Sequence, residues 1–221
     1  MRANSDLAEP AVSLVQQIIG KTASTLQTAF LNYLAGQTNR ARTGVILRVG
    51  GNTQDQSTYV ASQEPAIISS GASSNSSASV TPNLSLGPEL FAVLQNVTTL
   101  VNANWIVGLN FAAPQNDSNA VAFAGAAEQA LGSSLKSFQL GNEPDLYSSN
   151  GKRPSSYSIP AYIADFATEF RDINSSSSVS RKSIFAGPNV CCDWQVADIL
   201  SNGYLADFST SLNAFAVQHC A

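Results

Sequence analysis

The feature that most constrains the fold of this chain is the alternation of short apolar runs with longer segments of helical periodicity. Five runs have the length and composition of strands, namely residues 44–49, 105–111, 135–140, 183–186 and 212–217. Segments with helical spacing separate or precede them, namely residues 25–35, 88–101, 120–131, 161–173 and 196–205. Strands joined by helices of about 10 to 15 residues predict βα units around a parallel sheet.

Local residue choices predict how some of these elements begin and end. The nearly continuous apolar run GVILRV at 44–49 predicts a strand buried on both faces. LKSFQL at 135–140 alternates and predicts a half-buried strand that ends at about Glu143, because Pro144 cannot donate a ladder hydrogen bond. Gly36 predicts the end of the first helix, and the Ser-rich stretch 64–86 predicts a loop that carries a sugar at Asn75 or Asn83.

The length of the chain limits how much of a barrel it can form. A closed (β/α)8 barrel takes about 250 residues, whereas this chain has 221 residues and ends while still on a strand. The predicted fold class is therefore α/β, an incomplete (β/α)8 TIM barrel with about five to six βα units. We expect residues 1–24 to be a poorly defined N-terminal segment and residues 25–221 to form the partial barrel domain.

Composition excludes several classes of partner. Only 12% of the residues are charged, and the net charge is −4. No basic stripe is present to meet phosphates, which argues against a nucleic-acid partner. No apolar run approaches the roughly 18 residues of a membrane span. Gln16 and Gln17 interrupt the short run 12–20, so there is no clear signal peptide.

The cysteines and the single histidine do not predict a metal site. Adjacent cysteines such as Cys191 and Cys192 rarely bond each other, and His219 has only Cys220 beside it, which is not a zinc spacing. Five N-glycosylation sequons favour a secreted glycoprotein, although only weakly in a chain this rich in Asn and Ser; they start at Asn75, Asn83, Asn96, Asn116 and Asn174.

Polar side chains follow the end of every predicted strand. In chain order they are Arg48, Asn52, Asp55, Asn110, Asn142, Glu143, Asn189, Gln218 and His219. In a parallel barrel these carboxyl ends share one rim, so the groups are expected to line a single cleft. Amides and a few carboxylates suit hydroxyl-rich ligands, whereas phosphate calls for Lys, Arg or a Gly-rich helix start. Gly50-Gly51 has no third glycine and no helix after it, so it is not a dinucleotide fingerprint.

Glu143 is the natural proton donor of such a cleft. Glycoside hydrolysis needs one acid for the departing oxygen and a second carboxylate opposite it. A carboxyl half-sheltered at a strand end can keep a raised pKa, and Asn142 beside it can hydrogen-bond a ring hydroxyl such as the 2-OH. Other readings stay open for the neighbours: Arg48 could pair with a core carboxylate, Asp55 could cap a loop, and His219 could be structural.

Five segments of the chain resemble glycoside hydrolase family 79, the β-glucuronidases and heparanase of the Asn-Glu-Pro clan of retaining glycosidases. They are ILRVGGNTQD, WIVGLNF, FQLGNEPDLY, FAGPNV and FAVQH, in order between about Thr43 and His219. The resemblance implies a TIM barrel followed by a small β-sandwich, secretion, retaining hydrolysis of β-glucuronides and no cofactor. By matching position Glu143 would be the acid/base. Asn142, Asn52 and Asn110 would contact the sugar, and Gln218 and His219 are further candidates.

The chain also departs from that family. The family's nucleophile is a glutamate on a later strand, beyond Ala221, and the residues before Thr25 do not resemble the family's opening. The family usually has His-Tyr where this chain has His219-Cys220. We therefore expect a truncated member that is inactive alone and that self-associates through open barrel edges. The alternatives are a non-catalytic carbohydrate-binding protein and a clan relative that acts on another β-glycoside.

Overall fold

A five-stranded parallel sheet is the central element of the protein. The computed structural model describes residues 28–70 and 82–218. Hydrogen-bonded neighbours in the sheet follow the order β1-β5-β6-β7-β8, and every neighbouring pair is parallel. The strands are β1 (Val45–Val49), β5 (Ala103–Leu109), β6 (Leu135–Leu140), β7 (Phe185–Pro188) and β8 (Leu212–Ala216).

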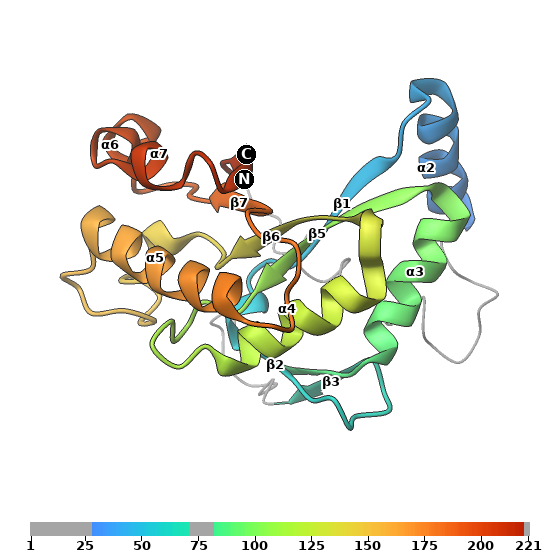
Figure 1. Ribbon diagram of the computed structural model, residues 1–221, viewed down its shortest axis with the longest axis horizontal. Coiled ribbons are helices and arrows are strands. Elements are labelled where there is room, and N and C mark those ends of the chain that lie inside the picture. The colour runs from blue at the N-terminus through green and yellow to red at the C-terminus, as the bar shows by residue number, and fades with distance from the viewer. Residues whose placement is uncertain (1–27, 71–81, 219–221) are drawn as a thin grey trace, which may run out of the picture.

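Helices connect these strands in the way that the sequence predicts. Each new strand of the main sheet is added beside the previous one after a helical crossover, and Figure 1 shows α3, α4 and α5 along one side of the sheet. The helices are α2 (Thr28–Ala41), α3 (Glu89–Val101), α4 (Ser118–Leu131), α5 (Ile159–Ser175), α6 (Val196–Ser201) and α7 (Tyr204–Phe208). Within residues 28–70 and 82–218, no helix has both the length and the apolar character needed to cross a membrane.

The core lies between the sheet and these helices. Side chains on the helix-facing side of the central strands are fully buried, among them Val107, Leu109, Phe138 and Phe185. Towards the C-terminal strands the core is aromatic: the Phe166 ring of α5 lies 4.7 Å from the Phe208 ring and 5.3 Å from the Tyr204 ring, centroid to centroid. Such aromatic contacts contribute both apolar burial and edge-to-face attraction.

The described residues do not form a closed barrel, and this changes the burial of the edge strands. β1 and β8 each have one neighbour, and the burial along both strands alternates. Ile46 on β1 is 63% exposed and Phe215 on β8 is 44% exposed. The prediction of a first strand buried on both faces is therefore wrong. Conversely β6, which we expected to be half-buried, is almost wholly buried because it lies at the centre of the sheet.

A second, three-stranded sheet lies between β1 and α3 in the chain. It consists of β2 (Ser57–Tyr59), β3 (Ile67–Ser70) and β4 (Asn83–Leu86), in the order β2-β4-β3, with β4 parallel to β2 and antiparallel to β3. The predicted loop at 64–86 thus contains two strands. Leu84 and Leu86 of β4 are buried in the main hydrophobic cluster, which explains why a Ser-rich segment can form a strand.

Three element boundaries differ from the sequence-based expectation. Helix α2 continues past Gly36 to Ala41, and the Thr38 hydroxyl donates a 2.9 Å hydrogen bond to the Val101 carbonyl, which ties this extension to α3. Strand β6 ends at Leu140 because Gly141, with φ of +70°, turns the chain away. The segment 196–205 forms two short helices, which Gly203 separates at φ of +94°.

The described sequons lie mostly at the surface. Asn83, Asn96 and Asn116 are exposed, whereas Asn174 is half-buried. Asn75, the 1–24 segment, His219 and Cys220 lie outside the described residues. Glycosylation and secretion stay predictions.

Candidate active site

Glu143 lies in the short connection between β6 and the 3-10 helix Pro144–Leu146. Its backbone is left-handed, with φ of 53°, and its side chain is half-buried. The Glu143 N–H donates a 3.2 Å hydrogen bond to the Asn189 carbonyl, which links the end of β6 to the end of β7. A non-glycine residue in this conformation costs about 1–2 kcal/mol, and such residues cluster at functional sites.

Asn142 is the centre of an amide cluster that joins several strand ends. Its Oδ1 accepts from Arg48 Nη2 at 2.6 Å and from Gln218 Nε2 at 2.9 Å. Its Nδ2 donates to Asn52 Oδ1 at 3.0 Å. Arg48 belongs to β1, Asn142 follows β6 and Gln218 follows β8. The structure therefore brings together Asn142, Asn52 and Gln218 from the predicted site, and their contact with a substrate stays a prediction.

Asp55 holds the backbone beneath this cluster. Its carboxylate is buried and accepts four hydrogen bonds: from the backbone N–H groups of Phe111 and Asn142, from the Tyr147 hydroxyl at 2.7 Å and from Lys152 Nζ at 3.1 Å. Burial, followed by the nearby Asp55 charge, raises the pKa of Tyr147 well above its ordinary value, so its hydroxyl stays a donor. Asp55 thus holds groups of four residues at once, which is more than the capping of a single loop.

Arg48 supplies positive charge at the same rim. Besides its bond to Asn142, its guanidinium lies within electrostatic reach of the carboxylates of Glu143 and Asp55. Partial desolvation lowers the pKa of Arg48, and the attraction of these two carboxylates opposes that shift. Since an arginine stays protonated in proteins, Arg48 is a permanent cation beside Glu143.

Two predicted site residues are not part of the amide cluster as the structure describes it. Asn110 donates to the Ser57 carbonyl and accepts from the Ala112 N–H, both at 2.8 Å, so its amide holds the turn after β5. A role of Asn110 in sugar binding stays a prediction. His219 lies outside the described residues.

Sequence reasoning missed Gln54, which is buried between the strand ends. Its Nε2 donates to the carbonyls of Leu109 and Gln139, at 2.9 and 3.0 Å, and so bridges β5 and β6. A Cβ at Gly108 would overlap the amide of Gln54. A glycine inside a strand often marks such a close approach, so the Gly in WIVGLNF was the available signal.

Sequence reasoning also missed Arg153, which anchors the loop that follows β6. Its guanidinium donates to the carbonyls of Phe111 and Ala112 and to the Asp165 carboxylate. It also lies over the rings of Tyr147 and Tyr157, at 5.4 Å from each centroid. The Tyr147 side chain is fully buried, so its role is to pack the loop after β6 against the rest of the protein.

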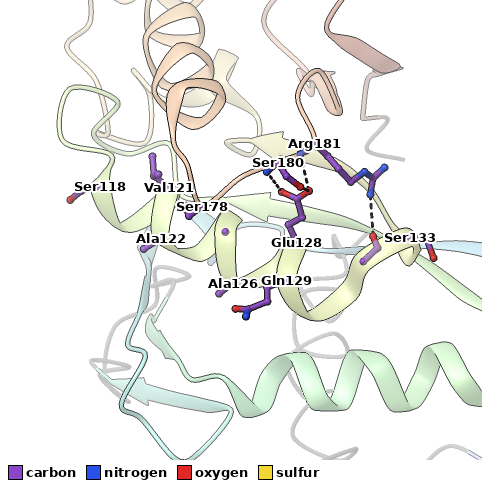
Figure 2. A pocket seen from close by; sticks show the side chains of 12 residues that line it. Ser118, Val121, Ala122, Ala126, Glu128, Gln129, Ser133, Ser178, Ser180 and Arg181 are labelled. Atoms are coloured by element: carbon purple, nitrogen blue, oxygen red, sulfur yellow. Dashed lines mark hydrogen bonds between the residues drawn. The ribbon is translucent and has the colours of Figure 1, made fainter.

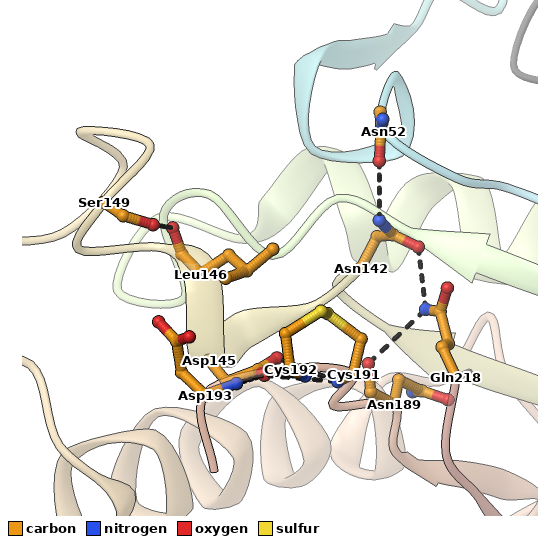
Figure 3. The surroundings of a disulfide bond; sticks show 10 residues. All are labelled: Asn52, Asn142, Asp145, Leu146, Ser149, Asn189, Cys191, Cys192, Asp193 and Gln218. Carbon is orange, nitrogen blue, oxygen red and sulfur yellow. Dashed lines mark hydrogen bonds between the residues drawn. A yellow bond between two sulfur atoms is a disulfide. The ribbon is translucent and has the colours of Figure 1, made fainter. Parts of the chain in front are cut away.

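The loop after β7 contains a disulfide between two adjacent residues, Cys191 and Cys192. The expectation from adjacent cysteines was therefore wrong for this pair. Figure 3 shows the disulfide and its surroundings, which include Asn142, Asn189 and Gln218. Asp145 and the two sulfurs lie within 4.8 Å of one another. Because disulfide sulfurs are not thiolates, this group does not provide a zinc ligand set in the described state.

A broad surface groove lies elsewhere, between α4 and the segment that leads into β7 (Figure 2). Its acid, Glu128, accepts hydrogen bonds from the Ser180 N–H and hydroxyl and from the Arg181 N–H. The residues after α4 and this segment lead into the amino ends of β6 and β7, whereas catalytic groups of parallel barrels lie at the carboxyl ends. The groove is therefore separate from the candidate active site.

The comparisons with known proteins concern the fold. No protein-family model matches the chain, and no curated protein matches it in sequence. Among solved structures the chain is similar to a 4-O-α-L-rhamnosyl-β-D-glucuronidase from Fusarium oxysporum, in a Rha-GlcA complex, with a TM-score of 0.68 and 20% sequence identity. The match covers 91% of this chain and 41% of that one, so the chain spans about two fifths of its neighbour's length. At this identity the likeness shows a shared partial TIM-barrel-like fold.

Proposed function

We propose that this chain carries the acid/base half of a retaining β-glycosidase active site and binds β-glucuronides. The observation that carries the proposal is the position of Glu143, which follows a central strand of the parallel sheet beside an amide cluster drawn from several strand ends. The fold shared with a fungal glucuronidase and the resemblance of five segments to family 79 support the same substrate class.

In this proposal Glu143 donates a proton to the glycosidic oxygen as the bond to the anomeric carbon breaks, and later takes a proton from the attacking water. The amide groups of Asn52, Asn142 and Gln218 hydrogen-bond the sugar hydroxyls, with Asn110 and His219 as further candidates. The permanent charge of Arg48 favours an anionic substrate beside Glu143. No cofactor takes part in this chemistry.

Retaining hydrolysis also needs a second carboxylate, about 5–5.5 Å from the first. Asp55, which bonds the Asn142 N–H, and Asp145, two residues after Glu143, are acids of the same region, and both carboxylates already accept several hydrogen bonds. Asp55 accepts four hydrogen bonds, and Asp145 accepts from the backbone N–H groups of Cys191, Cys192 and Asp193. We therefore propose that these 221 residues bind the sugar and donate the proton, and that neither Asp55 nor Asp145 is the nucleophile.

Binding and hydrolysis, measured separately, test the proposal. We expect the purified chain to bind methyl β-D-glucuronide in calorimetry, and to hydrolyse 4-nitrophenyl β-D-glucuronide at close to the buffer rate. Binding by Glu143→Gln is expected to stay within about threefold, since the substitution keeps the shape of the side chain. Hydrolysis by the unmodified chain that Glu143→Gln abolishes would show that a nucleophile is present, contrary to the proposal. Failure to bind any glycoside would overturn the proposal as a whole.

The engagement of Asp55 and Asp145 also favours a second candidate, a non-catalytic carbohydrate-binding protein. Azide, as an external nucleophile, distinguishes the two. If Glu143 is an acid, azide attacks the anomeric carbon of phenyl β-D-glucuronide, the bond to phenol breaks as Glu143 protonates its oxygen, and the α-glucuronosyl azide forms. We expect this product with the unmodified chain and at least tenfold less with Glu143→Gln. Saturable binding without any azide product would favour the binding protein.

A further inference from the structure

The Cys191–Cys192 disulfide lies in the loop after β7, and Asn142, Asn189 and Gln218 are among the residues that surround it. Asn189, two residues before it, presents its carbonyl both to the Glu143 N–H and, at 3.4 Å, to Gln218 Nε2. Gln218 in turn donates to Asn142. Figure 3 shows the contacts of Gln218 with Asn142 and Asn189 beside the two sulfurs. Cys192 is exposed and Cys191 is half-buried, so the loop that carries the disulfide lies at the surface.

The backbone that carries the disulfide is fixed by one buried carboxylate. Asp145 is 2% exposed, and its Oδ2 accepts from the N–H groups of Cys192 at 2.6 Å and Asp193 at 2.8 Å, while the Cys191 N–H lies 3.1 Å from Oδ1. Three successive N–H groups directed at one carboxylate form an anion nest. Asp145 follows Glu143 by two residues, so the same short segment holds both the acid and the disulfide loop.

The chemistry of the disulfide complements that of the amide cluster. A disulfide between adjacent residues closes a small rigid ring whose polarisable sulfurs accept hydrogen bonds only weakly. A pyranose ring has polar hydroxyls at its edge and apolar C–H groups on its faces. The aromatic rings of this region pack against one another: Tyr147 is fully buried, Tyr157 packs between Tyr147 and Trp194, and the half-buried Trp194 also contacts Tyr162.

We propose that the Cys191–Cys192 disulfide is an apolar platform on which the ring of a bound sugar packs while the amide cluster holds its hydroxyls. The inference rests on the proposed function, since it assumes that a glycoside binds beside Glu143. It assigns the disulfide a binding role, and it assigns Asp145 the role of positioning it. The platform covers one C–H face of the pyranose, which amounts to about 30–50 Å² of apolar surface, so we expect its loss to weaken binding about three- to tenfold.

The test uses the Cys220→Ser chain, in which the adjacent pair provides the only cysteines. Cysteine labelled with ¹³C at Cβ gives signals from these two residues alone, and methyl β-D-glucuronide is the probe. We expect nuclear Overhauser contacts between the sugar ring hydrogens and the cysteine Cβ hydrogens. We also expect a phosphine reductant to raise the dissociation constant about three- to tenfold. In that reaction the phosphine gives two electrons to the disulfide and takes its oxygen from water, whose two protons complete the two thiols. The Cys191→Ala/Cys192→Ala variant is expected to bind as weakly as the reduced chain and to be insensitive to the reductant.

Each outcome has a separate meaning. Sugar binding without contacts to the cysteine hydrogens, or with unchanged affinity after reduction, would overturn the platform and leave the proposed function standing. Absence of binding by the oxidised chain would overturn both. The contacts are measured on the oxidised chain, so the test stands even where the double alanine variant fails to fold.

Discussion

At the scale of single residues, buried carboxylates that do not themselves react fix the positions of the other residues in the candidate site. Asp55 connects the turn after β1 to Phe111, to the backbone of Asn142 and to the loop of Tyr147 and Lys152. Because these partners come from segments far apart in the chain, Asp55 fixes the position of the residue that precedes Glu143. Removing a carboxylate with this many donors is costly, since each buried donor is left without a hydrogen-bond acceptor.

We expect Asp55→Ala to lower the free energy of unfolding by about 3 to 5 kcal/mol, because it leaves the Lys152 ammonium and the Tyr147 hydroxyl without their acceptor. Urea unfolding followed by circular dichroism measures the change. Asp207→Ala, at an exposed position of α7, is the matched control and is expected to cost less than about 1 kcal/mol. Equal losses in the two variants would contradict the role assigned to Asp55.

Glu169 of α5 is the opposite case, a buried carboxyl with neither oxygen hydrogen-bonded. Burial, followed by the nearby charge of Asp117, raises the pKa of Glu169 well above its ordinary value, so the folded protein holds this proton to a higher pH than the unfolded chain does. The unfolded chain releases that proton near its ordinary pKa of about 4.3. Glu169 therefore favours folding most below that pH, and its contribution is lost as the pH rises towards the folded-state pKa.

We expect Glu169→Gln to raise the melting temperature at pH 7.5 by about 2 to 6 °C, since an amide has no ionised form to stabilise the unfolded chain. The difference is expected to shrink towards pH 4. Thermal melts from pH 4 to pH 8 measure it, with Glu64→Gln at an exposed position as the control. A gain from Glu169→Gln that is the same at all pH values would rule out this account.

At the scale of elements, the inner face of the sheet is shaped by one glycine and one glutamine. Gly108 in the middle of β5 leaves room for the Gln54 amide, whose hydrogen bonds join the ends of β5 and β6. The 3-10 helix Gln54–Gln56 thus packs on the strands that flank the Glu143 connection. A glycine in a strand usually weakens it, but here the absence of a side chain at Gly108 is what lets the Gln54 amide pack against β5.

We expect Gly108→Ala to cost about 2 to 3 kcal/mol, because its Cβ would lie 2.5 Å from the Gln54 Cδ. Chemical denaturation measures the change. The Gly108→Ala/Gln54→Ala double variant is expected to lose less unfolding free energy than the two single variants together, because the new Cβ at position 108 no longer overlaps the Gln54 amide. Gly36→Ala is the control: a Cβ there meets nothing within 4 Å and the site is helical, so we expect a gain of about 0.5 to 1 kcal/mol. Strict additivity of the two losses would show that Gly108 and Gln54 do not interact.

At the scale of the whole molecule, the main sheet has two open edges within the part of the chain that the structure describes, at β1 and β8. Ile46 and Phe215 lie on the two edge strands and are among the more exposed large apolar residues of the described chain. An apolar cavity of about 180 Å³ lies beside β1, lined in part by Leu34, Leu47 and Trp105. Unpaired edges and exposed apolar groups favour pairing with another chain.

We expect the 221-residue chain to self-associate in sedimentation velocity, increasingly so at higher concentration. Ile46→Lys/Phe215→Lys is expected to shift the distribution towards the monomer, because charges on edge strands oppose pairing. Leu100→Lys, on α3 and as exposed as Ile46 at 63%, is the control and is expected to leave the distribution unchanged. A monodisperse monomer with a cooperative melt would contradict the prediction.

The sequence by itself determined the order of the βα units and the position of Glu143 after β6. Local periodicity, together with Gly141 and Pro144, encodes which segments form strands and helices and where the chain turns. It did not determine the burial of the edge strands, because burial depends on how many neighbours a strand has in the sheet.

Only the tertiary structure decided which polar groups meet. Arg48 and Asn142 are 94 residues apart, and Asn142 and Gln218 are 76 apart, yet they share one hydrogen-bond cluster. The disulfide loop likewise takes its shape from Asp145, 46 residues before Cys191. Pattern and propensity act over a few residues, whereas hydrogen-bond partners at the rim of a sheet are chosen by strand order and register, which exist only once the chain is folded.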